Sequence, residues 1–166
     1  MFEKEKNTIK HASQMGLWGS VGVVIVAGLF LYASPWRFAP QTEYVNRWLL
    51  IAGSVLAVLS LSMALLVIRK QVPRLRQAET LEAKLTGYAS HVRSLFLSIF
   101  AVVVALCLMM VISNQNVLLM LAMVTVLTLF LAYPNIYKIK VDLGLTDEEM
   151  KTLYGDRYIA DTKNEE

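Results

Sequence analysis

Long apolar stretches without a charged side chain alternate with short charged segments along this chain. Residues 15–33 and 48–68 contain no Asp, Glu, Lys, Arg or His, and neither does the longer stretch 94–137. The hydrocarbon core of a bilayer is about 30 Å thick, so a spanning helix needs about 20 apolar residues. The longest stretch suffices for two crossings, with the polar residues 113–116 between them. The pattern predicts an all-α integral membrane protein with four transmembrane helices over residues 15–33, 48–68, 94–112 and 117–137.

The distribution of Lys and Arg predicts how these helices are oriented. Fourteen of the 16 basic residues lie in the N-terminal tail (1–14), the bridge between the second and third spans (69–93) and the C-terminal tail (138–166). Basic residues near span ends favour the cytoplasmic side. We therefore expect two helical hairpins with both termini in the cytoplasm, in a bacterial inner membrane. A soluble helical protein is disfavoured, because soluble helices need a polar face. A re-entrant, pore-lining element at 114–116 is a weaker alternative.

The charged bridge contains a narrow apolar stripe. Leu75, Ala78, Leu81 and Leu85 recur at spacings of three and four residues, which is typical of an amphipathic helix. We expect a short helix over residues 73–85, ended by Gly87. It would lie on the inner leaflet or extend the second span.

A second short helix is predicted within the C-terminal tail, over residues 143–155. Thr146 and Glu149 have the spacing of a capping box, and Gly155 is suited to the stop. From residue 141 onward the tail holds eight acids and three bases, whereas the bridge holds six bases and two acids. This complementarity suggests that the tail docks on the bridge; two separately solvated segments are the alternative. The candidate docking residues are Arg74, Arg76, Asp147, Glu148 and Glu149.

Small residues repeat along one face of each span. Association of helices in lipid depends on close packing at such residues. The predicted seams are Gly16 and Ser20 in the first span; Gly53, Ala57, Ser60 and Ala64 in the second; and Ser94, Ser98, Ala101 and Ala105 in the third. We expect these seams to hold a four-helix bundle, although the glycine-rich first span could also pair with a second copy.

The residues within the spans argue against several chemistries. Ionisable side chains inside a membrane are kept where ions or protons pass, and these spans contain none. His11 and His91 lie at span ends, where they do not suit a haem within the bundle. Cys107 is the single cysteine and has no partner for a disulfide or thiolate metal site. We expect no metal, no cofactor, no nucleic-acid partner and no enzymatic activity.

These observations lead to three functional hypotheses. The first is a non-enzymatic accessory or scaffold subunit that acts through helix packing and its cytoplasmic face, with the bilayer and a membrane protein or a second copy as partners. The second is a homo-oligomeric small-solute transporter or channel with a path lined by Ser54, Ser60, Ser98, Thr125 and Thr128. The weakest is a membrane enzyme at the cytoplasmic interface, around His11, His91 and the acidic tail.

Overall fold

The described part of the chain contains seven helices and no strand. The computed structural model describes residues 2–33, 43–66, 70, 72–113 and 115–155. Its helices are α1 (Glu3–Ala33), α2 (Glu43–Leu66), α3 (Val72–Arg76), α4 (Leu81–Ser113), α5 (Asn116–Ala132), α6 (Ile136–Leu143) and α7 (Asp147–Tyr154).

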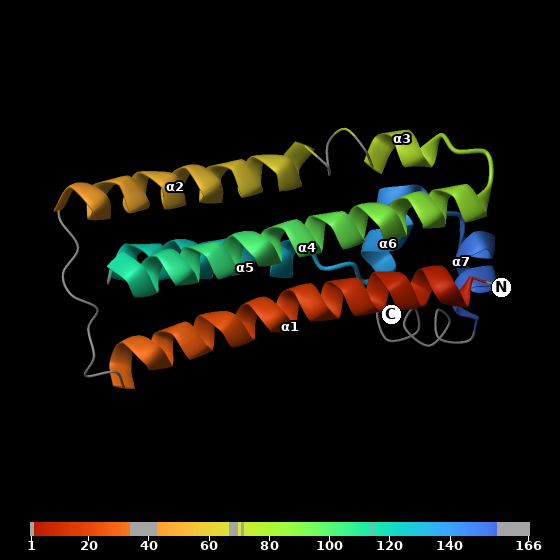
Figure 1. Cartoon of the computed structure of the whole chain (residues 1–166). Coiled ribbons are helices and arrows are strands. Elements are labelled where there is room, and N and C mark those ends of the chain that lie inside the picture. Colours follow the sequence, from red (N-terminus) through yellow and green to blue (C-terminus); the bar gives the residue numbers. More distant parts are fainter. Residues whose placement is uncertain (1, 34–42, 67–69, 71, 114, 156–166) are drawn as a thin grey trace, which may run out of the picture.

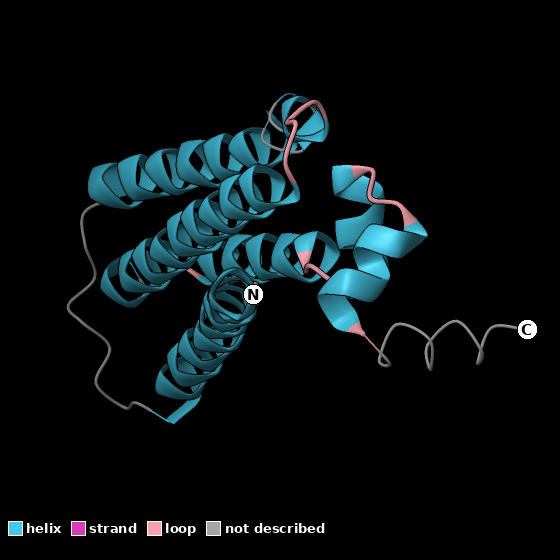
Figure 2. Cartoon of the chain, turned by 90° about the vertical axis from the view of Figure 1, so that its right-hand side faces the viewer, coloured by secondary structure: helices cyan, strands magenta, loops and turns pink. Residues whose placement is uncertain are grey.

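Four of the helices run side by side. In Figure 1, α4 and α5 lie between α1 and α2, and each outer helix packs against both central ones. The starts of α1 and α4 lie at one end, together with α3, α6 and α7. We call this end the cap: helices α3, α6 and α7 with the first turns of α1 and α4. Seen from that end in Figure 2, the last two helices lie to one side of the long ones.

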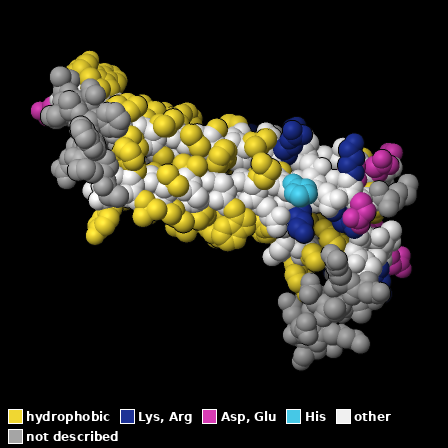
Figure 3. Space-filling model, turned by 60° about the horizontal axis from the view of Figure 1, so that its bottom comes forward, with side chains coloured by type: hydrophobic (Ala, Val, Ile, Leu, Met, Phe, Trp, Pro, Cys, Tyr) yellow, Lys and Arg dark blue, Asp and Glu magenta, His cyan; other side chains and the backbone are white. Residues whose placement is uncertain are grey.

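The long helices have the dimensions of membrane spans. α1, α2 and α4 are long and apolar enough to cross a bilayer, and α5 with α6, bent by 75°, would make a fourth span. Large apolar side chains such as Trp18, Leu65 and Leu131 are exposed on their outer surface. Figure 3 shows apolar side chains covering the length of the bundle, with charged ones gathered mainly toward one end. The described part of the chain is thus all-helical, with three helices, or four if the bent pair is one span, that are long and apolar enough to cross a membrane.

The last apolar helix is shorter than the sequence predicted. α5 ends at Ala132, before the predicted end of the span at residue 137, and covers about 25 Å at 1.5 Å per residue. Pro134 then disfavours continued helix, and Asn135 begins a new one by accepting a hydrogen bond from the Lys138 amide at 2.6 Å. The predicted tail helix over 143–155 begins later, at Asp147 (α7), and Leu143 is instead the last residue of α6, a helix that the sequence did not predict.

The bridge also differs from its predicted helix. α3 stops at Arg76, and a second helix begins after Thr80, whose hydroxyl accepts a hydrogen bond from the Ala83 amide at 3.2 Å. Gly87 was predicted to end a helix, but it lies inside α4. A Cβ there would lie 2.5 Å from Leu75 Cδ2, so Gly87 lets α3 pack closely on α4. At the other end of the chain, α1 begins at Glu3 and includes most of the predicted N-terminal tail.

Close packing at glycine joins α1 and α2 to the central helices. A Cβ on Gly16 would lie 2.8 Å from Phe96 Cβ, and one on Gly53 would overlap Leu118 Cδ2. Phe96 and Leu118 are completely buried. Because lipid provides little hydrophobic drive between helices, these close approaches are a main source of bundle stability.

The predicted seams fall in two different environments. Gly16 and Ser20 on α1 are buried, as are Gly53, Ala57, Ser60 and Ala64 on α2. On α4, however, Ser94, Ser98 and Ala101 are exposed and Ala105 is half-buried. The face of α4 that packs inside instead carries larger side chains, among them Phe96, Ile99, Val103, Leu106 and Met110. Small residues of α1 and α2 therefore pack against large side chains of α4.

Two glycines of α1 offer a matched test of this packing. Gly16→Ala would push a methyl group against Phe96, whereas Gly22 has nothing within 4 Å of an added Cβ. We expect Gly16→Ala to destabilise the protein by about 1–3 kcal/mol. Gly22→Ala should be neutral or stabilising by about 1 kcal/mol through helix propensity. Thermal unfolding in mild detergent measures both variants, and equal changes in Tm would contradict the packing described.

Candidate functional site: the cap and its groove

The bridge holds the tail through Arg76, one of the predicted docking residues. Its Nε donates to the Asp142 carbonyl at 2.9 Å and its Nη2 donates to the Val141 carbonyl at 2.6 Å. These carbonyls lie in the last turn of α6, where a helix leaves acceptors unpaired and favours positive charge. The tail does contact the bridge, although Arg76 binds backbone oxygens there. Gly144 ends α6 in the left-handed conformation (φ 60°), against the Arg76 side chain.

A second connection joins α4 to α6. The Tyr88 hydroxyl donates to Asp142 Oδ2 at 3.0 Å, and Tyr88 is only 4% exposed. Neither residue was among the predicted docking residues. The apolar stripe of the bridge would have identified Tyr88, because Leu81, Leu85 and Tyr88 follow one helical face that continues past Gly87.

Helix α7 begins with the predicted capping box, which is confirmed. The Thr146 amide donates to Glu149 Oε2 at 2.8 Å, and the Glu149 amide donates to Thr146 Oγ1 at 3.2 Å. The bond from the Thr146 backbone and the nearby Lys84 ammonium (3.9 Å) keep the pKa of Glu149 below its usual value. Glu149 thus caps the start of α7 and also lies close to Lys84 of α4. The predicted stop at Gly155 is confirmed as the C-cap of this helix.

The other predicted docking residues divide into two groups. Asp147 accepts from Lys140 Nζ at 2.7 Å, so it joins α7 to α6 rather than to the bridge. Arg74 and Glu148 are exposed, and no side-chain ion pair or hydrogen bond is recorded for either within the described residues. These two side chains remain directed to the surroundings of the cap.

The first turns of α1 complete the cap through Lys6. Its Nζ donates to the Leu153 carbonyl in the last turn of α7 at 2.8 Å and forms an ion pair with Glu3 at 2.6 Å. The same ammonium lies 5.5 Å from the centre of the Tyr154 ring. Beneath these polar contacts, Ile9 of α1 belongs to the same buried core as Met150 and Leu153 of α7. The N-terminal tail is therefore a structural part of the cap, which sequence reasoning did not identify.

A groove of about 890 Å³ opens between the start of α1 and the corner where α5 meets α6. One wall carries Lys6, Asn7 and Lys10 of α1, and the other carries residues 133–137 and Ile139. The lining contains both polar and apolar groups. Tyr133 and Tyr137 lie where α5 has ended, as aromatic residues do at a membrane boundary. The groove therefore crosses from the apolar bundle to the charged cap.

A smaller groove of about 390 Å³ lies between α2 and α4. Its lining includes Ser60, Ser94, Ser98 and His91. The other residues of the hypothesised transport path are not part of this lining. Thr125 is buried and donates to the Leu121 carbonyl of its own helix at 2.8 Å, while Thr128 donates to the Thr125 carbonyl.

The histidines belong to no cluster of metal-ligating side chains within the described residues. His11 is exposed on α1, and His91 is half-buried on α4. No group of three His, Cys, Asp or Glu side chains there is arranged to hold a metal ion. Cys107 is buried in the core of α4, as expected for a small apolar residue.

Comparisons with known proteins give no match to a family model, to a curated protein or to a solved structure.

Two arginines of α3 provide a matched test of how the tail is held. Arg76→Ala removes both bonds to α6, whereas Arg74→Ala removes the same charge from an exposed position. Bonds to a charged group contribute about 1.5–3 kcal/mol, so hydrogen exchange of α6 amides should accelerate about tenfold or more in Arg76→Ala. The exchange rates in Arg74→Ala should match wild type. An equal effect of both substitutions would show that Arg76 does not hold α6.

Proposed function

We propose that this chain is a non-enzymatic accessory or scaffold subunit of a membrane complex. The observation that carries the proposal is the division of labour among the charges of the cap. Arg76 joins α3 to α6, while the Lys84–Glu149 pair and Lys6 hold α7 against α4 and α1. Arg74, Glu79, Glu82 and Glu148 are exposed and take no part in any recorded ion pair of the described residues. A folded cap with an outer charged face is suited to binding a partner by electrostatic complementarity.

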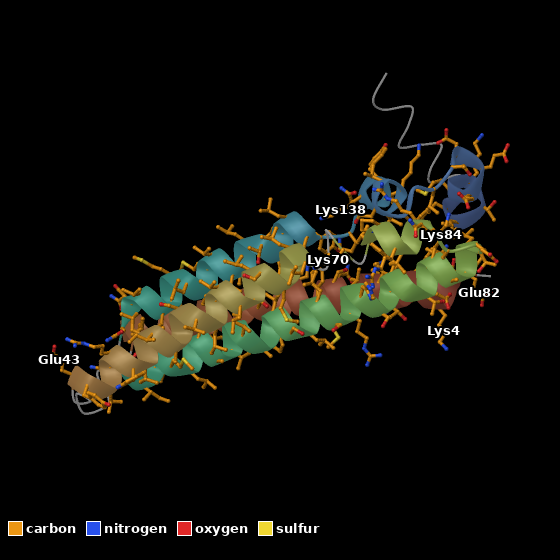
Figure 4. All side chains as sticks on the ribbon, turned by 90° about the horizontal axis from the view of Figure 1, so that it is seen from above. Lys4, Glu43, Lys70, Glu82, Lys84 and Lys138 are labelled. Carbon is orange, nitrogen blue, oxygen red and sulfur yellow. The ribbon has the colours of Figure 1, made fainter. Side chains whose placement is uncertain are left out.

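We further infer that the cap lies in the cytoplasm and that the protein crosses a bacterial inner membrane four times, as two hairpins. The distribution of basic residues supports this orientation. In Figure 4, Lys4 and Lys84 lie toward the end opposite Glu43, and Lys70 and Lys138 lie between the middle of the molecule and that end. Basic residues next to the spans favour the cytoplasmic side. In this topology α5 provides the fourth crossing, and α6, bent by 75° from it, belongs to the cytoplasmic cap.

A homo-oligomeric transporter is the second candidate. It is favoured by the groove between α2 and α4, where the hydroxyls of Ser94 and Ser98 are exposed on a predicted span. Thr125 is buried, and its hydroxyl donates to a carbonyl of its own helix, which weighs against a transport path that includes Thr125. This candidate gains support only if the protein is isolated alone as a defined oligomer and moves solute in proteoliposomes.

Charge reversal on the outer face tests the accessory role. A Glu82→Lys/Glu148→Lys variant should lower the recovery of a stoichiometric partner about tenfold in a mild-detergent pull-down with mass spectrometry. Like charges placed against a complementary surface are repelled, while the contacts that hold the cap stay intact. Glu43→Lys is the control, because Glu43 is exposed at the opposite end. Unchanged recovery in the double variant, or a chain isolated without any partner, would contradict the proposal.

A further inference from the structure

The groove between α1 and the α5–α6 corner has the features of a lipid headgroup site. Ser13, which lies just before the charge-free stretch of α1, is part of the lining, as are Tyr133 and Pro134, which follow the last residue of α5. The groove therefore opens at the level where the apolar helices end. Its volume of about 890 Å³ is within the range of small-ligand sites.

The charged groups of the lining differ in how far they are already engaged. Lys6 binds Glu3 and the Leu153 carbonyl, which uses two of the three donors of its ammonium. Lys10 lies one helical turn further along the same wall and is exposed. No ion pair or hydrogen bond of its ammonium is recorded within the part of the chain that the structure describes. Among the described residues of the lining, Lys10 is therefore the cation available to an incoming group, and Glu3 is the one acid, already paired.

The remaining lining groups suit an amphiphile with a phosphate head. Asn7 and Asn135 are exposed on opposite walls and offer amide donors, while Ile9 and Ile139 are buried and provide an apolar floor. Basic pockets between membrane helices on the cytoplasmic side are suited to anionic phospholipid headgroups. A choline head would instead place its own positive charge near Lys10.

We propose that this groove binds the headgroup of an anionic phospholipid, with the lipid phosphate at Lys10 and the acyl chains along the apolar surface of α1 and α5. The inference goes beyond the scaffold role and does not depend on it, because it concerns a lipid rather than a protein partner. Bound lipid would join the start of α1 to the α5–α6 corner, the two elements that form the walls of the groove.

Two lysines of α1 provide the test. The full-length protein in mild detergent is titrated with phosphatidylglycerol or phosphatidylcholine, and the bound lipid is counted by native mass spectrometry. Lys10→Gln should weaken phosphatidylglycerol binding about fivefold, the effect of one charge at the membrane surface. Lys4→Gln makes the same charge change at an exposed position outside the lining and should alter binding less than twofold. Lys10→Arg, which keeps the charge, should retain binding.

Three results would overturn the proposal. Equal losses of phosphatidylglycerol binding in Lys10→Gln and Lys4→Gln would show that the lipid is attracted to positive charge in general and is not bound at Lys10. Equal binding of phosphatidylglycerol and phosphatidylcholine would show that the headgroup charge is not recognised. Displacement of the lipid by millimolar inorganic phosphate, with the same dependence on Lys10, would assign the groove to a soluble phosphate compound. A thermal unfolding curve identical to wild type shows that Lys10→Gln remains folded.

Discussion

The structure depends on close packing of the large side chains of α4 against small residues of its neighbours. Helices in lipid gain little from the hydrophobic effect, so their association rests on close contact and on hydrogen bonds. Gly16 of α1 packs against Phe96 of α4, and Gly53 of α2 packs against Leu106 of α4 as well as Leu118 of α5. Since α4 packs against α1, α2, α3 and α5, it is the element on which the bundle and the cap both rest.

The cap is built under a different constraint. Helices of five and eight residues are too short to be stable alone in water, so α3, α6 and α7 depend on docking. Buried side chains such as Leu143 and Met150 supply apolar contact, and Arg76 and Lys6 satisfy carbonyls that the short helices leave unpaired. Positive charges near the membrane therefore have two roles: they favour one orientation, and they complete the fold.

Sequence signals predicted features that are determined locally, and missed those determined by distant contacts. The length and composition of the apolar stretches predicted the membrane-spanning helices, and the Thr146–Glu149 spacing predicted the start of α7. Gly87 was misinterpreted because its role is to accept Leu75, a contact that no local pattern reveals. The buried face of α4 was equally hidden, because both faces are apolar and the spacing of Ser94 and Ser98 does not say which side packs inward. Pro134 and Asn135, by contrast, are local signals of the end of α5, because proline disfavours continued helix and Asn135 caps the next one.

The most direct test is to measure from which side each end of the bundle can be reached. Single cysteines at Glu43→Cys and Lys151→Cys, in a Cys107→Ser background, are exposed to a membrane-impermeant maleimide in right-side-out vesicles. A cytoplasmic cap predicts that Glu43→Cys is labelled at once, and that Lys151→Cys, on α7, is labelled only after the membrane is permeabilised. Immediate labelling of both cysteines would place both ends on one side, which would contradict both the four-span topology and the cytoplasmic cap.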